Sequence, residues 1–243
     1  MTITHLHTGQ SNADGAATGG PAWPFSANNL AWDCEPTLTG AVGTHFVPAT
    51  LGAPPFLPDN KNCHGFWLGY YVAAETAKPV WTIHVSKGGQ KIEQWLNNGP
   101  MTQRIQQIWN VARQTPFVVA AQLFSWHQEG KKGNGAEDIE AYPAKFNTLR
   151  DDYVARGLVS PNAIVLIYPR SPSLWQFAID FNTMLTTLAA TNPRWAFVSP
   201  LDAETGLPLT TVPGQPVHFD GPALCQLGWN AYHEWHLKKL AGY

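Results

Sequence analysis

The sequence predicts an α/β fold in which helices cover both faces of a doubly wound parallel sheet. Five short β-prone or apolar segments alternate along the chain with segments of helical periodicity. The polar motifs follow the ends of these segments, where an open parallel sheet binds its ligands. The 243 residues are within the size of one core, so we expect a single domain over residues 1–243.

The predicted strands rest on local pattern. Residues 2–7 alternate and end where Gly9 begins a turn, and residues 163–168 form an unbroken apolar run typical of a buried parallel strand. Residues 13–62 are rich in Gly, Pro and Asn and show little periodicity, so we expect long surface loops with at most a short helical turn there. The predicted strands are 2–7, 80–86, 117–126, 163–168 and 195–199.

Helical segments lie between and after these strands. We expect helices over residues 63–77, 101–114 and 138–156, the last despite Pro143. The next two show an apolar stripe on one side, which predicts packing on a sheet face. In the first of them the stripe is Phe177, Phe181, Met184, Leu185 and Leu188, and in the C-terminal helix it is Leu224, Leu227, Ala231 and Trp235.

Composition excludes several classes of partner. The chain has 15 basic and 17 acidic residues, a net charge near −2, and no basic run that would follow a phosphate backbone or an anionic membrane. No apolar stretch reaches the roughly 18 residues of a membrane span. We therefore expect neither a nucleic acid nor a membrane partner.

The N-terminus and the cysteines carry little information on compartment. The N-terminus shows no basic and apolar regions of a signal peptide, although a chain whose leader had been removed, or a piece of a longer polypeptide, would read the same. Secretion after processing and a phage origin both stay open. Cys34, Cys63 and Cys225 are odd in number and far apart, which indicates neither a disulfide framework nor a metal motif.

Four segments in order carry residues suited to acyl transfer. Gly9-Gln10-Ser11-Asn12 follows the first strand, where a turn can present a serine hydroxyl, although alone it is also ordinary turn chemistry. Lys87-Gly88-Gly89 follows the second strand, and small residues there let backbone N–H groups approach a ligand. The segment 125–130 ends the third strand with an amide, an imidazole and a carboxylate, and His218 precedes the last helix.

These four blocks together resemble the SGNH hydrolases, in the branch of acetylxylan esterases and sialic-acid-specific O-acetylesterases. The matching residues are Gly9-Gln10-Ser11-Asn12, Lys87-Gly88-Gly89 with Ile92 and Trp95, Trp126-His127-Gln128, and His218-Phe219 with Leu227-Gly228. The resemblance covers nearly the whole chain. It implies a flavodoxin-like three-layer sandwich with a five-stranded parallel sheet, and a carboxylic ester hydrolase that acts on acetylated carbohydrate.

The resemblance also implies roles for individual residues. Ser11 would be the nucleophile and His218 its general base, while the backbone N–H groups of Ser11, Gly88 and Gly89 and the Gln128 side chain would form the oxyanion hole. This agrees with the chemistry, since a serine hydroxyl needs a base within hydrogen-bond reach and the tetrahedral intermediate needs donors. Neither a metal nor a cofactor is required.

The catalytic acid departs from the family pattern. Many SGNH enzymes have Asp three residues before the histidine, and this chain has Gln215 there. Glu129 is our first candidate for the acid, with Asp202 and Asp220 as alternatives. Gln215 would hold the histidine tautomer without supplying a charge.

Further polar and aromatic residues are candidates for substrate contacts. We expect Gln10, Asn12, Trp126 and His127, which belong to the motifs, to face the substrate. Trp23, Phe25 and Trp32 in the early loop segment either stack on sugar rings or cover the core. His5 and His7 on the first strand are expected to make structural hydrogen bonds, and residues 233–236 lack the spacing of a zinc motif and read as a solvated helix face.

The leading functional hypothesis is a serine esterase that removes O-acetyl groups from a sugar or polysaccharide. Acetylated xylan, sialic acid and bacterial surface polysaccharide are all compatible substrates. A carbohydrate-binding module on an inactivated esterase scaffold is the alternative from another class, motivated by the altered acid positions. An SGNH lipase or thioesterase is a third possibility.

Overall fold

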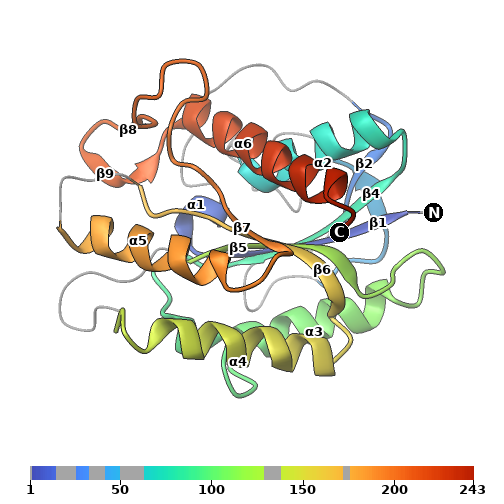
Figure 1. Cartoon of the computed structure of the whole chain (residues 1–243). Helices are drawn as coiled ribbons and strands as arrows, with labels where there is room; N and C mark the ends of the chain where they lie inside the picture. Colours follow the sequence, from blue (N-terminus) through green and yellow to red (C-terminus); the bar gives the residue numbers. More distant parts are fainter. Residues whose placement is uncertain (1, 15–25, 33–41, 50–62, 129–137, 172–175) are drawn as a thin grey trace.

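A seven-stranded sheet lies between two layers of helices in the computed structural model, which describes residues 2–14, 26–32, 42–49, 63–128, 138–171 and 176–243 (Figure 1). The strand order is β3-β2-β4-β1-β5-β6-β7. All neighbouring pairs are parallel except β2 and β3. The strands are β1 Ile3–Gly9, β2 Asn29–Trp32, β3 Phe46–Pro48, β4 Val80–Ser86, β5 Ala121–His127, β6 Val159–Ile167 and β7 Trp195–Phe197.

The predicted α/β sandwich is confirmed, and the strand count needs a correction. The five predicted strands correspond to β1, β4, β5, β6 and β7, and their order β4-β1-β5-β6-β7 is the flavodoxin-like order. The sheet gains β2 and β3 at the β4 edge, from a segment for which we expected loops. These strands have four and three residues, which is too short for an alternating pattern to be recognised.

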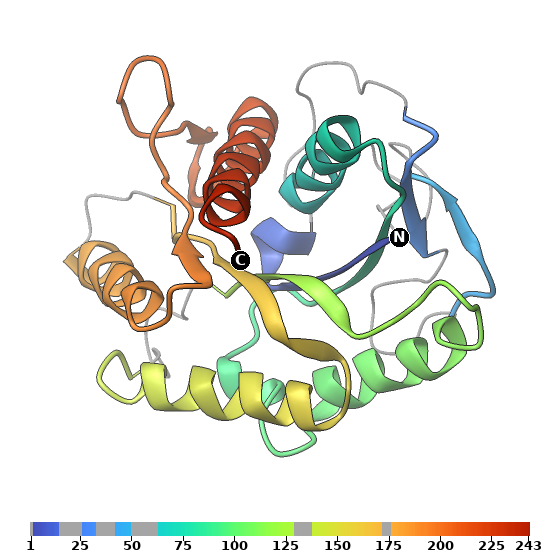
Figure 2. The ribbon, with the colours of Figure 1, turned by 45° about the vertical axis from the view of Figure 1, so that its right-hand side comes forward.

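Helices cover the two faces of the sheet as predicted. Helices α2 (His64–Thr76) and α6 (Gly221–Leu240) lie on one face, and α3 (Pro100–Ala112) and α4 (Tyr142–Ala155) lie on the other (Figures 1 and 2). Helix α5 (Gln176–Ala190) packs beside β7. Pro143 lies in the first turn of α4, where its missing N–H removes no helical hydrogen bond. No helix among the described residues combines the length and apolar character needed to cross a bilayer.

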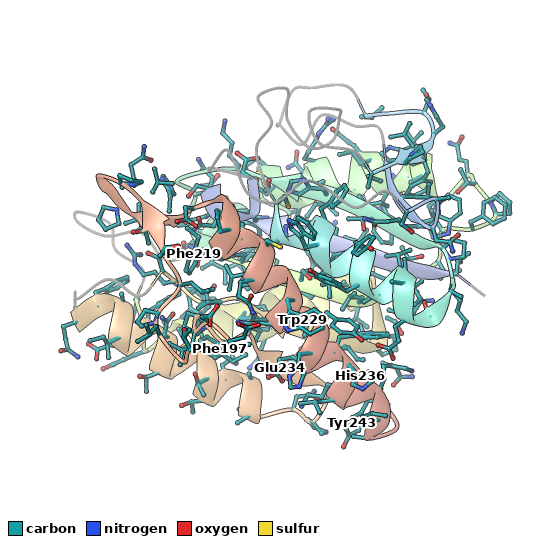
Figure 3. The ribbon with its side chains drawn as sticks, turned by 90° about the horizontal axis from the view of Figure 1, so that it is seen from above. Phe197, Phe219, Trp229, Glu234, His236 and Tyr243 are labelled. Carbon is teal, nitrogen blue, oxygen red and sulfur yellow. The ribbon has the colours of Figure 1, made fainter. Side chains whose placement is uncertain are left out.

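The two helical layers bury separate apolar clusters. Phe181, Leu185 and Leu188 of α5 join the cluster under α3 and α4, as the predicted stripe required. All four predicted apolar residues of α6 are buried against the other face. The opposite side of α6 carries Trp229 and His236 (Figure 3), and His236 Nδ1 lies 2.9 Å from the Glu75 carboxylate of α2.

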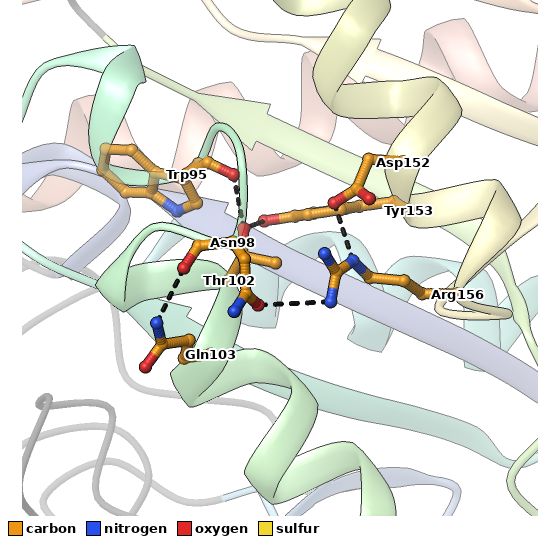
Figure 4. Close-up of polar contacts among 7 residues, drawn as sticks. All are labelled: Trp95, Asn98, Thr102, Gln103, Asp152, Tyr153 and Arg156. Atoms are coloured by element: carbon orange, nitrogen blue, oxygen red, sulfur yellow. Dashed lines mark hydrogen bonds and ion pairs between the residues drawn. The ribbon is translucent and has the colours of Figure 1, made fainter.

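Polar contacts fix the loop that follows β4. Behind the short 3₁₀ turn η1 (Ile92–Gln94), the hydroxyl of Thr102 donates to the backbone oxygen of Trp95 and lies 3.1 Å from the hydroxyl of Tyr153 (Figure 4). Arg156 bonds both Asp152 and Asn98 in the same region. The Trp95 indole N–H in turn lies 3.2 Å from the Thr8 hydroxyl on β1. The core beneath the end of β1 is thereby tied to α3 and α4.

Candidate active site

Ser11 and His218 are in hydrogen-bond contact although 206 residues lie between them in the chain. Ser11 is the first residue of the short helix α1 (Ser11–Asp14), which follows β1 directly. His218 lies on β9 (Gln215–Phe219), which pairs with β8 (Thr211–Val212) just before α6. The Ser11 Oγ is 3.0 Å from His218 Nε2. The two residues that the sequence singled out therefore meet at the carboxyl end of the sheet.

The turn that presents Ser11 lies at the point where the sheet reverses its strand order. Gly9 has φ +155°, and a Cβ there would overlap the carbonyl oxygen of His127 on β5. The N–H of Gln10 donates to that same carbonyl at 2.8 Å, and the N–H of Lys87 donates to Gly9 at 3.0 Å. The loops after β1, β4 and β5 are thus joined at the switch point, where doubly wound folds bind ligands.

Asn12 attaches the serine turn to the histidine strand. Its side-chain N–H donates to the Val217 carbonyl at 3.0 Å, and its side-chain oxygen accepts from the Phe219 N–H at 3.0 Å. These two bonds hold the backbone on both sides of His218. Asn12 is fully buried, so the prediction that it contacts substrate is corrected: its position makes it a residue that sets the Ser11–His218 geometry.

The His218 ring is oriented by an amide. The side-chain oxygen of Gln215 lies 2.8 Å from Nδ1. Because this oxygen only accepts, Nδ1 carries the proton and Nε2 offers its lone pair to the Ser11 hydroxyl. Partial burial lowers the pKa of His218 below its usual 6.5, which favours the neutral ring. This is the protonation state that a general base needs.

The two described carboxylates that were considered for the catalytic acid bind groups other than His218. Asp220 is the N-cap of α6 and accepts the N–H of Ala223 at 2.9 Å. Asp202 accepts from the N–H and the hydroxyl of Thr205 in its own exposed loop. Glu129 lies outside the described residues. In the part of the chain described, the partners of the two His218 ring nitrogens are Ser11 and Gln215, and neither is a carboxylate.

The residues predicted to form the oxyanion hole lie in the loops after β4 and β5, which are bonded to the turn that carries Ser11. A Cβ built on Gly88 would be 3.6 Å from Ser11 Cβ, an ordinary van der Waals contact, so this backbone lies beside the serine. Gly89 has φ +70°, a conformation that side chains other than glycine rarely adopt. The Gln128 amide donates to the Gln90 carbonyl at 3.3 Å, and the Gln10 amide donates to the same oxygen. Gln90, which the sequence did not single out, therefore positions two predicted site residues.

Two predicted substrate contacts are wrong for the structure as described. Trp126 is fully buried, and its N–H donates to the Tyr142 hydroxyl at 2.9 Å. His127 is also fully buried between His64 and the Pro169 carbonyl. Both lie at the carboxyl end of β5, where successive side chains point into the layers on either side of the sheet. Because helices cover both faces of the sheet, the side chains on both sides of β5 are buried, and the motif alone does not show this.

One of the three aromatic residues of the early segment, Trp32, is among the described residues. Trp32 is buried at the end of β2, and its N–H donates to the Val42 carbonyl, so it covers the core. Trp23 and Phe25 lie outside the described residues. Gln10 is 4% exposed and its amide donates to the Gln90 carbonyl, so little of its side chain is open to a substrate. His5 makes the expected structural hydrogen bonds, to Thr82 at 3.2 Å and Ser125 at 2.8 Å.

No protein-family model and no curated protein matches the sequence. Solved structures with a similar fold include a protein from Arabidopsis thaliana, with a TM-score of 0.73, 13% identity, and coverage of 97% of this chain and 98% of that one. NanS has a TM-score of 0.65 and 12% identity over 100% and 98% of the two chains. A carbohydrate acetylesterase from Xanthomonas citri has a TM-score of 0.57 and 13% identity over 96% and 55%.

At these identities the likeness concerns the fold. Over 96–100% of its length the chain shares its fold with NanS and with solved carbohydrate esterases, and this is the kind of fold that the resemblance to SGNH hydrolases implied.

Proposed function

We propose that the protein is a serine esterase that removes O-acetyl or other short acyl groups from a carbohydrate. The observation that carries the proposal is the 3.0 Å contact between Ser11 Oγ and a His218 ring held in the tautomer that accepts a proton. A hydroxyl in this arrangement is an activated nucleophile. The carbohydrate substrate is supported by the neighbours named as carbohydrate esterases.

The proposed reaction has two steps. Ser11 Oγ attacks the ester carbonyl while its proton passes to His218 Nε2, and the tetrahedral intermediate places its oxyanion near the N–H groups of Ser11, Gly88 and Gly89 and the amide of Gln128. The intermediate collapses, the sugar oxygen leaves with the proton from His218, and the acyl group stays on Ser11. Water then attacks this ester while its proton passes to His218 Nε2, and collapse of the second tetrahedral intermediate returns that proton to Ser11 Oγ and releases the carboxylic acid.

Gln215 sets the expected rate of this chemistry. Its amide oxygen holds the His218 tautomer but carries no full negative charge to stabilise the imidazolium that forms in each step. In serine proteases the loss of the carboxylate costs about 10⁴ in kcat, much of it from the wrong tautomer. Gln215 avoids the tautomer penalty, so we expect an esterase slower than one with a full triad.

The experiment is hydrolysis of p-nitrophenyl acetate, followed by acetate release from acetylated xylan and from O-acetylated sialic acid. Ser11→Ala should remove turnover on all active substrates. Ser160→Ala, which changes a serine at the amino end of β6, should leave turnover unchanged. Acyl esters of increasing chain length separate the acetylesterase from a lipase, which would prefer long chains. Turnover retained by Ser11→Ala would reject the assignment.

A carbohydrate-binding module is the second candidate, and the amide at position 215 is the observation that favours it. A fluorophosphonate probe distinguishes the two. The esterase should be labelled at Ser11, and the label should disappear in Ser11→Ala. A binding module would stay unlabelled and still bind acetylated glycan.

A further inference from the structure

Five histidines are buried between the sheet and α2, in a layer that would ordinarily be apolar. His5 and His7 come from β1, His84 from β4, His127 from β5 and His64 from α2, and each is at most 1% exposed. His7 and His84 are register partners on neighbouring strands. The reaction proposed for Ser11 uses none of the five. A polar layer of this kind needs a reason, because buried imidazoles are costly unless their nitrogens are bound.

Cys63 meets this layer at the start of α2. Its Sγ lies 3.5 Å from His7 Nε2, and His7, Cys63 and His84 each offer a ligand atom within 4.8 Å of the others. All three residues are buried. Two imidazoles and a thiol are ligands that Zn²⁺ prefers.

The spacing fits tetrahedral zinc. With Zn–S near 2.3 Å and Zn–N near 2.0–2.1 Å, a tetrahedral angle places sulfur and nitrogen about 3.5–3.6 Å apart. The Cys63–His7 distance already has this value. The other two separations are at most 4.8 Å and would close by up to about 1.5 Å to reach the spacings of the same geometry, which rotation of the His84 imidazole can supply.

Ser86 and Asp14 set the tautomer of His84. The Ser86 hydroxyl donates to the Asp14 carboxylate at 2.8 Å and lies 2.9 Å from His84 Nε2. Because the hydroxyl proton goes to the carboxylate, its oxygen accepts a proton from Nε2, and the lone pair is on Nδ1. Histidines that bind metals commonly donate their other N–H into such a chain ending in a carboxylate.

Burial keeps both His84 and Cys63 uncharged while no metal is bound. Burial lowers the pKa of His84 to about 4, and the Asp14 carboxylate opposes that shift. Burial raises the pKa of the Cys63 thiol to about 12, with the same carboxylate adding to the effect. Without a metal, Cys63 therefore remains a thiol. A divalent cation would stabilise its thiolate, and the charges of thiolate and Asp14 together would balance the ion.

We propose that His7, Cys63 and His84 bind a structural Zn²⁺, with a water molecule as the fourth ligand and the Asp14 carboxylate as its hydrogen-bond acceptor. The ion would join β1, β4 and the start of α2 beneath the turn that carries Ser11. Because the ligands come from positions 7, 63 and 84, no short sequence motif signals the site. In the alternative, no metal is bound. The Cys63 thiol then donates to the Ala13 carbonyl at 3.3 Å and lies beside the His7 imidazole.

The test measures metal binding on the whole chain. The protein is unfolded in denaturant that contains a chelator, so that any bound metal is removed. It is then refolded with one equivalent of Zn²⁺ or Co²⁺ and desalted. We expect about one zinc per chain by elemental analysis and a cobalt–thiolate charge-transfer band in the cobalt form. Cys63→Ser should lose the band, while Cys225→Ala, which removes the half-buried cysteine of α6, should keep both metal and band.

The wild-type cobalt spectrum keeps the test decisive if a variant does not fold, since the band itself reports sulfur as a ligand. A refolded wild-type protein that holds less than about a tenth of an equivalent of zinc and shows no band would overturn the proposal. Equal zinc binding by folded Cys63→Ser would overturn it as well, because the ion would then lie elsewhere. None of these measurements depends on esterase activity.

Discussion

The side-chain oxygen of Gln215 lies 2.8 Å from Nδ1 of His218, so an amide occupies the position that a carboxylate has in a serine–histidine–acid triad. Gln215→Glu replaces it with a carboxylate of nearly the same shape. The new charge stabilises the imidazolium, so we expect kcat/KM to rise by about tenfold or more. Initial rates on p-nitrophenyl acetate measure the change, and Gln107→Glu, an exposed glutamine on α3, controls for net charge.

The same variant has a signature in its pH profile. A carboxylate at position 215 raises the pKa of His218, so the acid limb of kcat/KM should move to higher pH by about one unit or more. An increase in rate without this movement would mean that the glutamate acts by another route. An unchanged rate and limb together would contradict the role of residue 215.

The proposed esterase activity of the wild-type protein should persist into mildly acidic solution. Burial lowers the pKa of His218 below 6.5, and the proposed role of this ring as general base requires it to be neutral. Activity is therefore fully present above about pH 6.5 and is lost as the pH falls through the lowered value. The pH dependence of kcat/KM, with tryptophan fluorescence to confirm folding at each point, checks this. An acid limb centred above 6.5 would indicate a negative charge close to the ring.

Asp220 should matter for stability and not for chemistry. Its side chain caps α6 by accepting the Ala223 N–H, and asparagine is an equally good cap. Asp220→Asn should therefore retain both stability and kcat within about twofold, whereas Asp220→Ala should lose about 1 kcal/mol of unfolding free energy. Urea unfolding and initial rates measure the two effects. A fall in kcat of several hundredfold in Asp220→Asn would make this carboxylate the catalytic acid.

Asn12→Ala should separate positioning from general stability. It leaves the Val217 carbonyl and the Phe219 N–H without their buried partner, at a cost of about 2–4 kcal/mol, and it releases the backbone around His218. We expect kcat to fall by at least about tenfold with a smaller change in KM. Asn230→Ala is the matched control, since Asn230 also makes two buried bonds, to Ser199 and Leu201, away from Ser11. Equal losses of kcat in both variants would show that Asn12 acts through stability alone.

The parts of the site that the sequence predicted are those fixed by topology. Ser11 follows the first strand and His218 precedes the last helix, and in a doubly wound sheet both positions fall at the same edge. The contact at 3.0 Å agrees with that reasoning. The interest of Gln215 followed from the resemblance, which implies the catalytic acid three residues before the histidine, and its side chain does reach the ring.

The parts that were missed depend on register and burial, which a linear pattern does not contain. A polar residue at every second position of β1 ordinarily indicates a solvent-facing side, yet His5 and His7 face the covered side of the sheet. Their partners come from β4, β5 and α2, so only the pairing of His7 with His84 reveals the layer. For the same reason Trp126 and His127 looked like site residues.

The buried histidine layer predicts steep acid unfolding. Burial is the largest cause that lowers the pKa of each member: His5 and His127 to about 3, His84 to about 4, and His7 and His64 well below 6.5. Below about pH 6.5 the unfolded chain takes up these protons and the folded chain does not. Stability is therefore fully present above about pH 6.5 and falls as the pH drops toward 4, by about 1.4 kcal/mol per pH unit for each histidine.

This slope can be measured from urea unfolding at a series of pH values, with chelator present so that metal release does not contribute. His5→Gln, which removes one member, should reduce the slope by about 1.4 kcal/mol per pH unit and shift the acid transition to lower pH. His233→Gln, at an exposed position on α6, should leave the slope unchanged. An unfolding free energy that stays constant from about pH 7 to 5 would mean that these imidazoles do not stay neutral and buried in the folded protein, because each buried neutral ring must contribute to the slope.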